Sequence, residues 1–136
     1  DVLELGTGYY STLLLNWMGL ITGRKIVSYD TVEKWANRAK KYYKSDNHEI
    51  YFEPDLDKVN LTGRYWGLIL IDHNPNERRM VDTIRLKDYA EFLVLHDTNP
   101  KYNIYPDIDK YFKFIYQDKS SRSWTAVVSN YKQFKP

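Results

Sequence analysis

The sequence has 136 residues, 43% of them hydrophobic, a formal net charge of +2 and no cysteine. That length favours a single domain, the small charge argues against a nucleic-acid partner, and the absence of cysteine excludes a disulfide framework, a thiolate metal site and a thiol nucleophile. No apolar run approaches the length that spans a bilayer and no signal-peptide pattern is present, so we expect a soluble, cytoplasmic protein without a membrane partner.

The stretch 2–8 (VLELGTG) predicts a buried strand that runs straight into a glycine turn. Gly6 and Gly8 allow a tight turn and a close approach of the backbone. A helix is expected to begin at Ser11, which is typical of a capped helix start. The strand, the turn and the helix N-terminus together present free N–H groups to one point, which suits an anionic or polar ligand group.

The first half of the chain then alternates between helix and strand. Strands are predicted over 25–30 and 49–53, and a second helix, capped by Thr31, is predicted over 32–44. The helix predicted over 12–22 has apolar residues at helical spacing, namely Leu13, Leu14, Trp17, Met18 and Ile21.

The second half continues the alternation and closes differently. The remaining predicted elements are a strand over 65–71, a helix that begins at Pro75 and Asn76, a strand over 91–95, a short helix after Pro106, and a hairpin of 113–117 with 124–129. Alternating strands and helices favour a doubly wound, Rossmann-like α/β fold. We therefore expect a mostly parallel sheet with helices on both faces and a C-terminal antiparallel hairpin.

Four of the five predicted parallel strands end in polar residues. In an open α/β sheet, ligands bind outside the carboxyl ends of the strands. These ends therefore predict one polar rim, to which the strands contribute residues 6–8, Asp30, residues 72–73 and residues 96–98.

At this point the chain resembles the class I S-adenosylmethionine-dependent methyltransferases. Residues 4–8 (ELGTG) resemble the first motif, Asp30 the acid that closes the second strand, 69–73 (ILIDH) the fourth motif, and 124–128 (WTAVV) the antiparallel last strand. The family often has a third glycine where Tyr10 stands. Helices that precede the first strand in many members are absent from this single domain, so a partner chain or an oligomer is expected to complete an open substrate cleft.

The resemblance implies S-adenosylmethionine as the cofactor. Asp30 would accept hydrogen bonds from both ribose hydroxyls, and Asp55 or Asp57 would face the adenine amino group. Each lone acid has an alternative interpretation as a solvated loop residue or a helix cap. The implied cofactor-binding set is Glu4, Gly6, Thr7, Gly8, Tyr10, Ser11, Asp30, Thr31, Asp55, Asp57 and Asp72.

Two histidines at the predicted rim are candidates for a general base. If the acceptor is a hydroxyl, His73 or His96 would take its proton next to Asp72, although each could instead be a structural histidine. Asp72 with Asp97 and Thr98 also resembles the oxygen-ligand set of the divalent-metal O-methyltransferases. That set implies Mg²⁺, which would lower the pKa of the acceptor hydroxyl.

The resemblance leaves several substrate classes open. Residues 72–79 look like methyltransferase-like proteins connected with sugar modification, which implies O-methylation of a small-molecule or sugar hydroxyl. A nucleic-acid or protein methyltransferase would instead dock its substrate on the basic helix 32–44. A cofactor-binding module without catalysis is a third interpretation.

Two further readings come from the residues alone. The spacing G-x-G-x-x-S over 6–11 nearly fits a nicotinamide-dinucleotide fingerprint. Arg78 and Arg79 lie in the first turn of a predicted helix, where cations oppose the macrodipole. They therefore indicate either a nearby substrate anion or pairing with Glu77 or Asp82.

Overall fold

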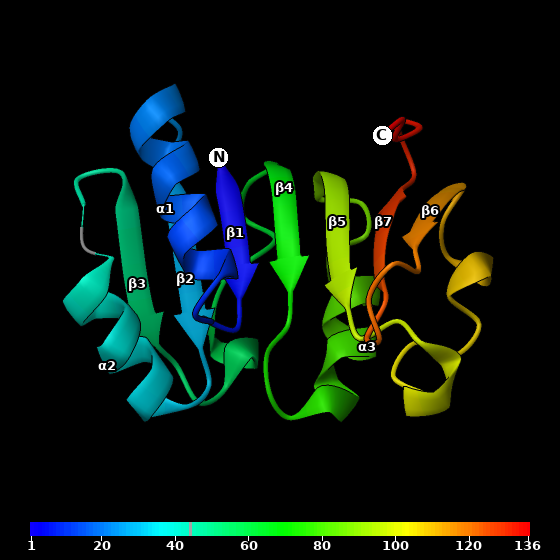
Figure 1. The fold of residues 1–136 in the computed structure, drawn as a ribbon, viewed down its shortest axis with the longest axis horizontal. Helices are drawn as coiled ribbons and strands as arrows, with labels where there is room; N and C mark the ends of the chain where they lie inside the picture. The colour runs from blue at the N-terminus through cyan, green and yellow to red at the C-terminus, as the bar shows by residue number, and fades with distance from the viewer. Residues whose placement is uncertain (44) are drawn as a thin grey trace.

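The computed structural model describes residues 1–43 and 45–136, which form one seven-stranded sheet (Figure 1). The strand order is β3-β2-β1-β4-β5-β7-β6. The strands are β1 (Val2–Leu5), β2 (Ile26–Asp30), β3 (His48–Phe52), β4 (Trp66–Ile71), β5 (Ala90–His96), β6 (Phe114–Asp118) and β7 (Thr125–Ser129). Strands β1 to β5 pair in parallel, and β7 pairs antiparallel with both β5 and β6. The predicted mostly parallel sheet with a C-terminal antiparallel hairpin is confirmed.

Helices cover both faces of this sheet, as predicted. In Figure 1, α1 (Ser11–Thr22) and α2 (Glu33–Tyr42) lie in front of β1, β2 and β3, and α3 (Asn76–Leu86) lies behind the sheet. Three short 3₁₀ turns complete the fold: η1 (Leu56–Lys58), η2 (Pro100–Tyr102) and η3 (Ile108–Lys110). The helix predicted after Pro106 is therefore only a 3₁₀ turn. Within the described residues, no helix combines the length and the apolar character needed to cross a bilayer.

The main core lies between the sheet and α3. Alternate strand residues point to this side because successive side chains in a strand face opposite ways. The strand residues on this side that have no exposed surface include Leu3, Leu5, Ile69, Ile71, Leu93 and Leu95. They pack with Leu86 of α3. This packing fixes the strand ends that carry the polar residues.

The inward face of α1 differs from the predicted one. Leu14, Trp17 and Ile21 are 57–84% exposed. The helix instead turns Thr12, Leu15, Asn16 and Gly19 toward the sheet. A Cβ on Gly19 would lie 2.9 Å from Ile26 Cγ1, so this glycine allows close helix–strand packing, and Thr12 and Asn16 hydrogen bond to buried polar side chains. Of the five predicted apolar residues, Leu13 and Met18 pack against the core, whereas the other three lie on the outer face of α1.

Candidate functional site

The glycine turn after β1 packs directly on the chain that leaves β4. Gly6 has a φ of +94°, and a Cβ there would lie 2.5 Å from the carbonyl carbon of Asp72 and from His73 N. Hydrogen bonds from Gly6 N to Tyr29 O and from Asp72 N to Leu5 O, both 2.8 Å, fix the turn between β2 and β4. Only glycine fits here. The close approach predicted from the sequence is therefore made by the protein's own backbone.

Asp30 closes β2 and holds Thr7 of the glycine turn. Its Oδ2 accepts hydrogen bonds from Thr7 N (2.7 Å) and Thr7 Oγ1 (2.6 Å), and its Oδ1 accepts one from Val32 N (2.8 Å). A carboxylate offers about four lone-pair positions, so most are used within the protein. The predicted binding of both ribose hydroxyls therefore requires the Thr7 hydroxyl to turn away.

Glu4 supports the glycine turn from inside the sheet and has no exposed surface. Its carboxylate accepts hydrogen bonds from Thr12 Oγ1 (2.9 Å) and Ser28 Oγ (2.6 Å), and Thr12 Oγ1 accepts one from Gly8 N (2.8 Å). Burial raises the pKa of Glu4 to about 7 against the opposing effect of the hydroxyl donors. The role in cofactor binding that the resemblance implies for Glu4 stays a prediction; within the structure, Glu4 orders the turn through Thr12.

Two other residues predicted around the turn lie at its surface. Tyr10, at the place of the family's third glycine, is 88% exposed. Ser11 is half-buried, and its hydroxyl lies 3.1 Å from the position of a Cβ on Gly8. Neither Ser11 nor Thr31 caps a helix through its side chain, contrary to the sequence-based expectation.

A cavity of about 240 Å³ lies at the carboxyl ends of β2, β3 and β4. Thr31 and Asp55, both predicted to bind the cofactor, contribute to its wall. The Thr31 hydroxyl donates a hydrogen bond of 2.5 Å to Asn74 O, and both residues belong to the cavity wall. The complete lining is Thr31, Pro54, Asp55, Leu56, His73, Asn74, Pro75 and Arg78. This combination of apolar and polar groups suits a purine base.

Asp57 lies outside this cavity. Its carboxylate pairs with Arg78 Nη2 (2.7 Å) and Arg85 Nη1 (3.1 Å). The hydrogen bond from Arg78 holds the pKa of Asp57 below its usual value. The predicted contact of Asp57 with adenine is therefore not supported, and of the two acids only Asp55 reaches the cavity.

The carboxyl ends of β4 and β5 are joined by Arg79, which is 4% exposed. Its guanidinium donates to Asp97 Oδ2 (2.9 Å) and to His73 O (2.7 Å), and lies 3.0 Å from Asp72 Oδ1. The contacts with the two aspartates are charge-assisted, which makes them stronger than hydrogen bonds between neutral groups. Arg79 therefore pairs with neither Glu77 nor Asp82 and instead holds two rim acids in place.

His96 completes this cluster. Its Nδ1 lies 3.1 Å from Asp72 Oδ1 and 3.4 Å from Asp97 Oδ2, and its side chain is 40% exposed. The hydrogen bond with Asp72 raises the pKa of His96. Burial alone would raise the pKa of Asp97, but the hydrogen bond from Arg79 and the charge of His96 lower it. The structure thus brings the predicted Asp72 and His96 together.

His73 is separated from the rim surface. Its ring is 1% exposed and its Nε2 lies 3.0 Å from Asp82 Oδ2, although the two groups are not aligned for a regular hydrogen bond. Asp82 belongs to α3 and is fully buried. A buried ring facing a buried carboxylate cannot reach an acceptor, so the structure gives no support to His73 as a general base.

The predicted magnesium set does not form. Thr98 is tied to β6, because its Oγ1 accepts a hydrogen bond of 3.2 Å from Gln117 Nε2. The acidic groups that do converge are Asp72 and Asp97, joined by His96 rather than Thr98. Magnesium prefers oxygen ligands, and the guanidinium of Arg79 already pairs with both carboxylates and places a positive charge beside them. The residues present therefore do not fit Mg²⁺.

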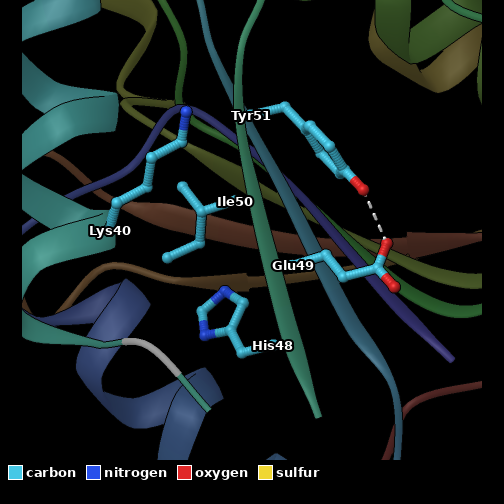
Figure 2. Close-up of a pocket in the computed structure, with 5 residues that line it drawn as sticks. All are labelled: Lys40, His48, Glu49, Ile50 and Tyr51. Atoms are coloured by element: carbon cyan, nitrogen blue, oxygen red, sulfur yellow. Dashed lines mark hydrogen bonds between the residues drawn. The ribbon is translucent and has the colours of Figure 1, made fainter. Parts of the chain in front are cut away.

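A second cavity, of about 370 Å³, lies at the open edge of β3 (Figure 2). Figure 2 shows Lys40, His48 and Ile50 on the α2 side of the strand, with Glu49 and Tyr51 on the other side. The His48 ring is held 2.8 Å from Ser28 Oγ, and burial lowers its pKa to about 4. No predicted cofactor or catalytic residue lines this cavity, so we assign the site to the rim.

No protein-family model matches the sequence, and a search of curated proteins finds no match. Solved structures do match. The catalytic domain of human METTL16 in complex with the MAT2A 3'UTR hairpin 1 aligns with a TM-score of 0.67 at 13% identity, over 96% of this chain and 64% of that chain. Human methyltransferase-like protein 13 in complex with SAH aligns with a TM-score of 0.67 at 13% identity, over 96% of this chain and 71% of that chain.

A bacterial protein has the same architecture. The ribosomal protein L11 methylase from Lactobacillus delbrueckii subsp. bulgaricus aligns with a TM-score of 0.63 at 16% identity, over 96% of this chain and 70% of that chain. The fold is that of the class I methyltransferases. The chain spans 61% of the length of the matched N-terminal domain of human METTL16.

The strand order separates this methyltransferase fold from the dinucleotide-binding one. The Rossmann order is 3-2-1-4-5-6, whereas here the antiparallel β7 lies between β5 and β6. The G-x-G-x-x-S spacing alone could not distinguish the two. The sequence did not predict that Arg79 would join two acids of the rim. The indication that it did contain was the unfavourable position of this cation in the first turn of α3.

Proposed function

We propose that the chain is an S-adenosylmethionine-dependent methyltransferase that acts at the carboxyl rim of its sheet. The observation that carries the proposal is the placement of two features on either side of the Gly6 turn. One is the cavity lined by Thr31 and Asp55, which suits an adenosine group. The other is the pair of His96 and Asp72. Two solved structures of this fold are complexes with SAH, which supports S-adenosylmethionine as the cofactor.

The residues at the rim fit the cofactor. Leu56 and Thr31 offer apolar and polar contacts to a base, and Asp30, which precedes Thr31, would accept a hydrogen bond from a hydroxyl once the Thr7 hydroxyl turns away. When bound, S-adenosylmethionine supplies a methyl group on a sulfonium; the acceptor's lone pair forms the new bond, and the electrons of the broken carbon–sulfur bond remain on sulfur, which gives SAH.

His96 is the residue placed to take the acceptor's proton. Because its Nδ1 faces Asp72, the Nδ1–H tautomer is favoured and the lone pair lies on Nε2. Asp72 is in turn held by Arg79. A base placed in this way typically contributes about 10²–10⁴-fold to the rate. No metal is required in this scheme.

The acceptor class that we propose is a nucleic acid or a protein. This replaces the small-molecule or sugar hydroxyl expected from the sequence. It is supported by the solved structures with this fold, which include a complex with a 3'UTR hairpin and a ribosomal protein methylase. The half-exposed side chain of His96 is compatible with a large acceptor.

Calorimetric titration tests the cofactor site. We expect the 136-residue chain to bind S-adenosylmethionine and SAH but not NAD. Asp30→Ala should remove binding, because Asp30 fixes Thr7 of the glycine turn and precedes Thr31 in the cavity wall. Asp57→Asn is the matched control, since this acid lies outside the cavity, and it should bind normally. Binding of NAD alone, or full binding by a folded Asp30→Ala, would refute the assignment.

Methyl transfer from a labelled cofactor tests the acceptor class. RNA, a mixture of ribosomal proteins and a set of small hydroxyl compounds should be offered to the wild-type chain and to His96→Ala. Label in RNA or protein that is lost in His96→Ala supports the proposal. Label confined to the small compounds would restore the earlier expectation instead.

A further inference from the structure

Two loops meet beside the carboxyl end of β5, next to the catalytic pair. In Figure 1 the turn between β6 and β7 reaches the end of β5 and the chain that follows it. Asn99 binds the loops together, because its N donates to Ser123 O (3.1 Å) and its Nδ2 donates to Arg122 O (3.0 Å). Thr98 N adds a hydrogen bond to Trp124 O (3.3 Å). The two loops therefore form one continuous surface.

This surface pairs lysines with aromatic rings. Lys101 Nζ lies 4.8 Å from the centroid of the Tyr102 ring, and Lys119 Nζ lies 4.7 Å from that of Trp124. Arg122 is exposed beside them. Cation–π contacts hold the rings beside the charges. We call these five residues the lysine–aromatic surface.

The backbone at this surface is held in an uncommon conformation. Trp124 has a φ of +56°, which is an outlier for a bulky residue, and Asp97 has a φ of +60°. Such conformations persist only where the surroundings fix them, and they cluster at ligand-binding positions. The hydrogen bond from Thr98 N to the carbonyl oxygen of Trp124 holds the backbone of Trp124 in its conformation. Trp124 directly precedes Thr125, the strand partner of His96, so its backbone lies beside the carboxyl end of β5.

We infer that the lysine–aromatic surface binds a single-stranded nucleic acid and presents one of its bases to His96. This inference rests on the proposed function and names its substrate class. Lysine and arginine side chains neutralise phosphates, and the rings of the exposed Tyr102 and the half-buried Trp124 can stack on bases. Stacking on a side chain requires an unpaired base, so a single strand fits and a duplex does not.

The acids near this surface are engaged elsewhere. Asp118 turns back into its own loop, where it accepts a hydrogen bond of 2.8 Å from Ser120 N. Asp97 pairs with Arg79, and Asp107 pairs with Lys110 at 2.9 Å. The three cations of the lysine–aromatic surface are therefore free to meet phosphates.

A second group of exposed lysines lies on α2 and provides a matched control. Lys34, Lys40 and Lys41 belong to the helix that the sequence suggested as a docking face. That helix packs on β2 and β3, and β3 is the edge strand on the far side of the sheet from β5 and β7. A nucleic acid bound on α2 would therefore not lie beside His96.

Fluorescence anisotropy with labelled 12-nucleotide RNA, single-stranded and duplex, tests the inference. The double variant Lys101→Ala/Lys119→Ala should bind the single strand about tenfold or more weakly. The slope of log affinity against log salt should fall by about 1.4, because two phosphate contacts are lost. The control Lys40→Ala/Lys41→Ala should bind like the wild-type chain. Equal losses in the two double variants would overturn the inference.

Ring substitutions test stacking separately from charge. Tyr102→Ala and Trp124→Ala should each weaken binding by about 5- to 100-fold, and Trp124→Phe should retain most of the affinity because it keeps an aromatic face. Binding of the duplex as tightly as the single strand would overturn the inference.

A titration with SAH distinguishes a failure of RNA binding from a failure of the proposed function. All variants of the lysine–aromatic surface should bind SAH like the wild-type chain, because none lines the adenosine cavity. A wild-type chain that binds SAH but no RNA overturns this inference and leaves the proposed function intact. A wild-type chain that does not bind SAH overturns both.

Discussion

Arg79 Nη1 donates a hydrogen bond of 2.9 Å to Asp97 Oδ2, and this contact joins the ends of β4 and β5. The same guanidinium lies 3.0 Å from Asp72, which orients His96. A cation in the first turn of α3 is unfavourable for the helix macrodipole. Its position is explained by the two carboxylates, which would otherwise repel each other across the rim.

Arg79→Ala should therefore destabilise the fold and the site together. Removing one partner of a buried ion pair leaves the others uncompensated, so we expect the free energy of unfolding to fall by about 3–5 kcal/mol in urea denaturation. Arg79→Lys keeps the charge but loses the planar guanidinium, so its free energy of unfolding should lie between those of the wild-type chain and Arg79→Ala. The control Arg78→Ala removes a more exposed arginine, whose partners Asp57 and Asp82 both keep Arg85, and should reduce stability less. Equal stabilities of Arg79→Ala and Arg78→Ala would contradict this role.

His96 should give the activity and the stability opposite pH dependences. The hydrogen bond with Asp72 raises the pKa of His96 above 6.5, and a base acts when deprotonated, so kcat/KM should rise with pH and level off above the raised pKa. Asp72→Asn should move this midpoint to lower pH. The protonated ring stabilises the fold fully below about pH 6.5, and that contribution is lost as pH rises through the folded pKa.

An NMR titration of the His96 ring checks the assignment directly. The ring should titrate above 6.5 in the wild-type chain and at lower pH in Asp72→Asn. His96→Gln should remove the pH-dependent step in kcat/KM, with a rate loss of about 10²–10⁴-fold. A profile unchanged in His96→Gln would show that another group takes the proton.

Glu4 should make stability fall as pH rises from about 4.5 to about 7. Its folded pKa, about 7, lies above the ordinary value, so in this range the folded state binds a proton that the unfolded state has lost. The full effect is roughly 3 kcal/mol. His48, whose pKa is lowered to about 4, changes stability in the opposite direction over about pH 4–6.5, so only a difference between variants isolates Glu4.

The variant that does this is Glu4→Gln, which is neutral and has the same shape. Its stability, relative to the wild-type chain, should improve steadily between pH 4.5 and 7 in urea denaturation. Glu77→Gln, on the exposed surface of α3, should run parallel to the wild-type chain. A constant difference between Glu4→Gln and wild type across this range would show that Glu4 ionises normally.

The sequence was sufficient for the sheet and for the rim, because both depend on local patterns. Short segments rich in apolar residues predicted every parallel strand, and the polar residues at the strand ends predicted Asp30, Asp72 and His96 at one edge. These positions follow from parallel pairing alone. The substrate class did not follow, since it depends on loops whose arrangement has no periodic signal.

Burial of polar residues was the information that the sequence could not give. The helix α1 turns Thr12 and Asn16 inward because Glu4 and His48 already lie within the sheet and need partners. Leu14 and Trp17 then face outward, against the simple apolar pattern. For the same reason His73, adjacent to Asp72 in the chain, points into the core toward Asp82 instead of to the rim.

Gly6→Ala tests whether the turn is needed for the whole site. A Cβ at Gly6 would lie 2.5 Å from the backbone of Asp72, which cannot move without breaking the pairing of β1 with β4. Gly23→Ala is the control, because Gly23 also has a positive φ (+71°) but has nothing within 4 Å of its Cβ position. Gly23→Ala should cost only about 1–2 kcal/mol of backbone strain and keep SAH binding. Gly6→Ala should lose SAH binding and most of its stability, as measured by calorimetry and thermal unfolding. If both variants lost only the strain energy, the seating of the turn on β4 would not be what holds the rim together.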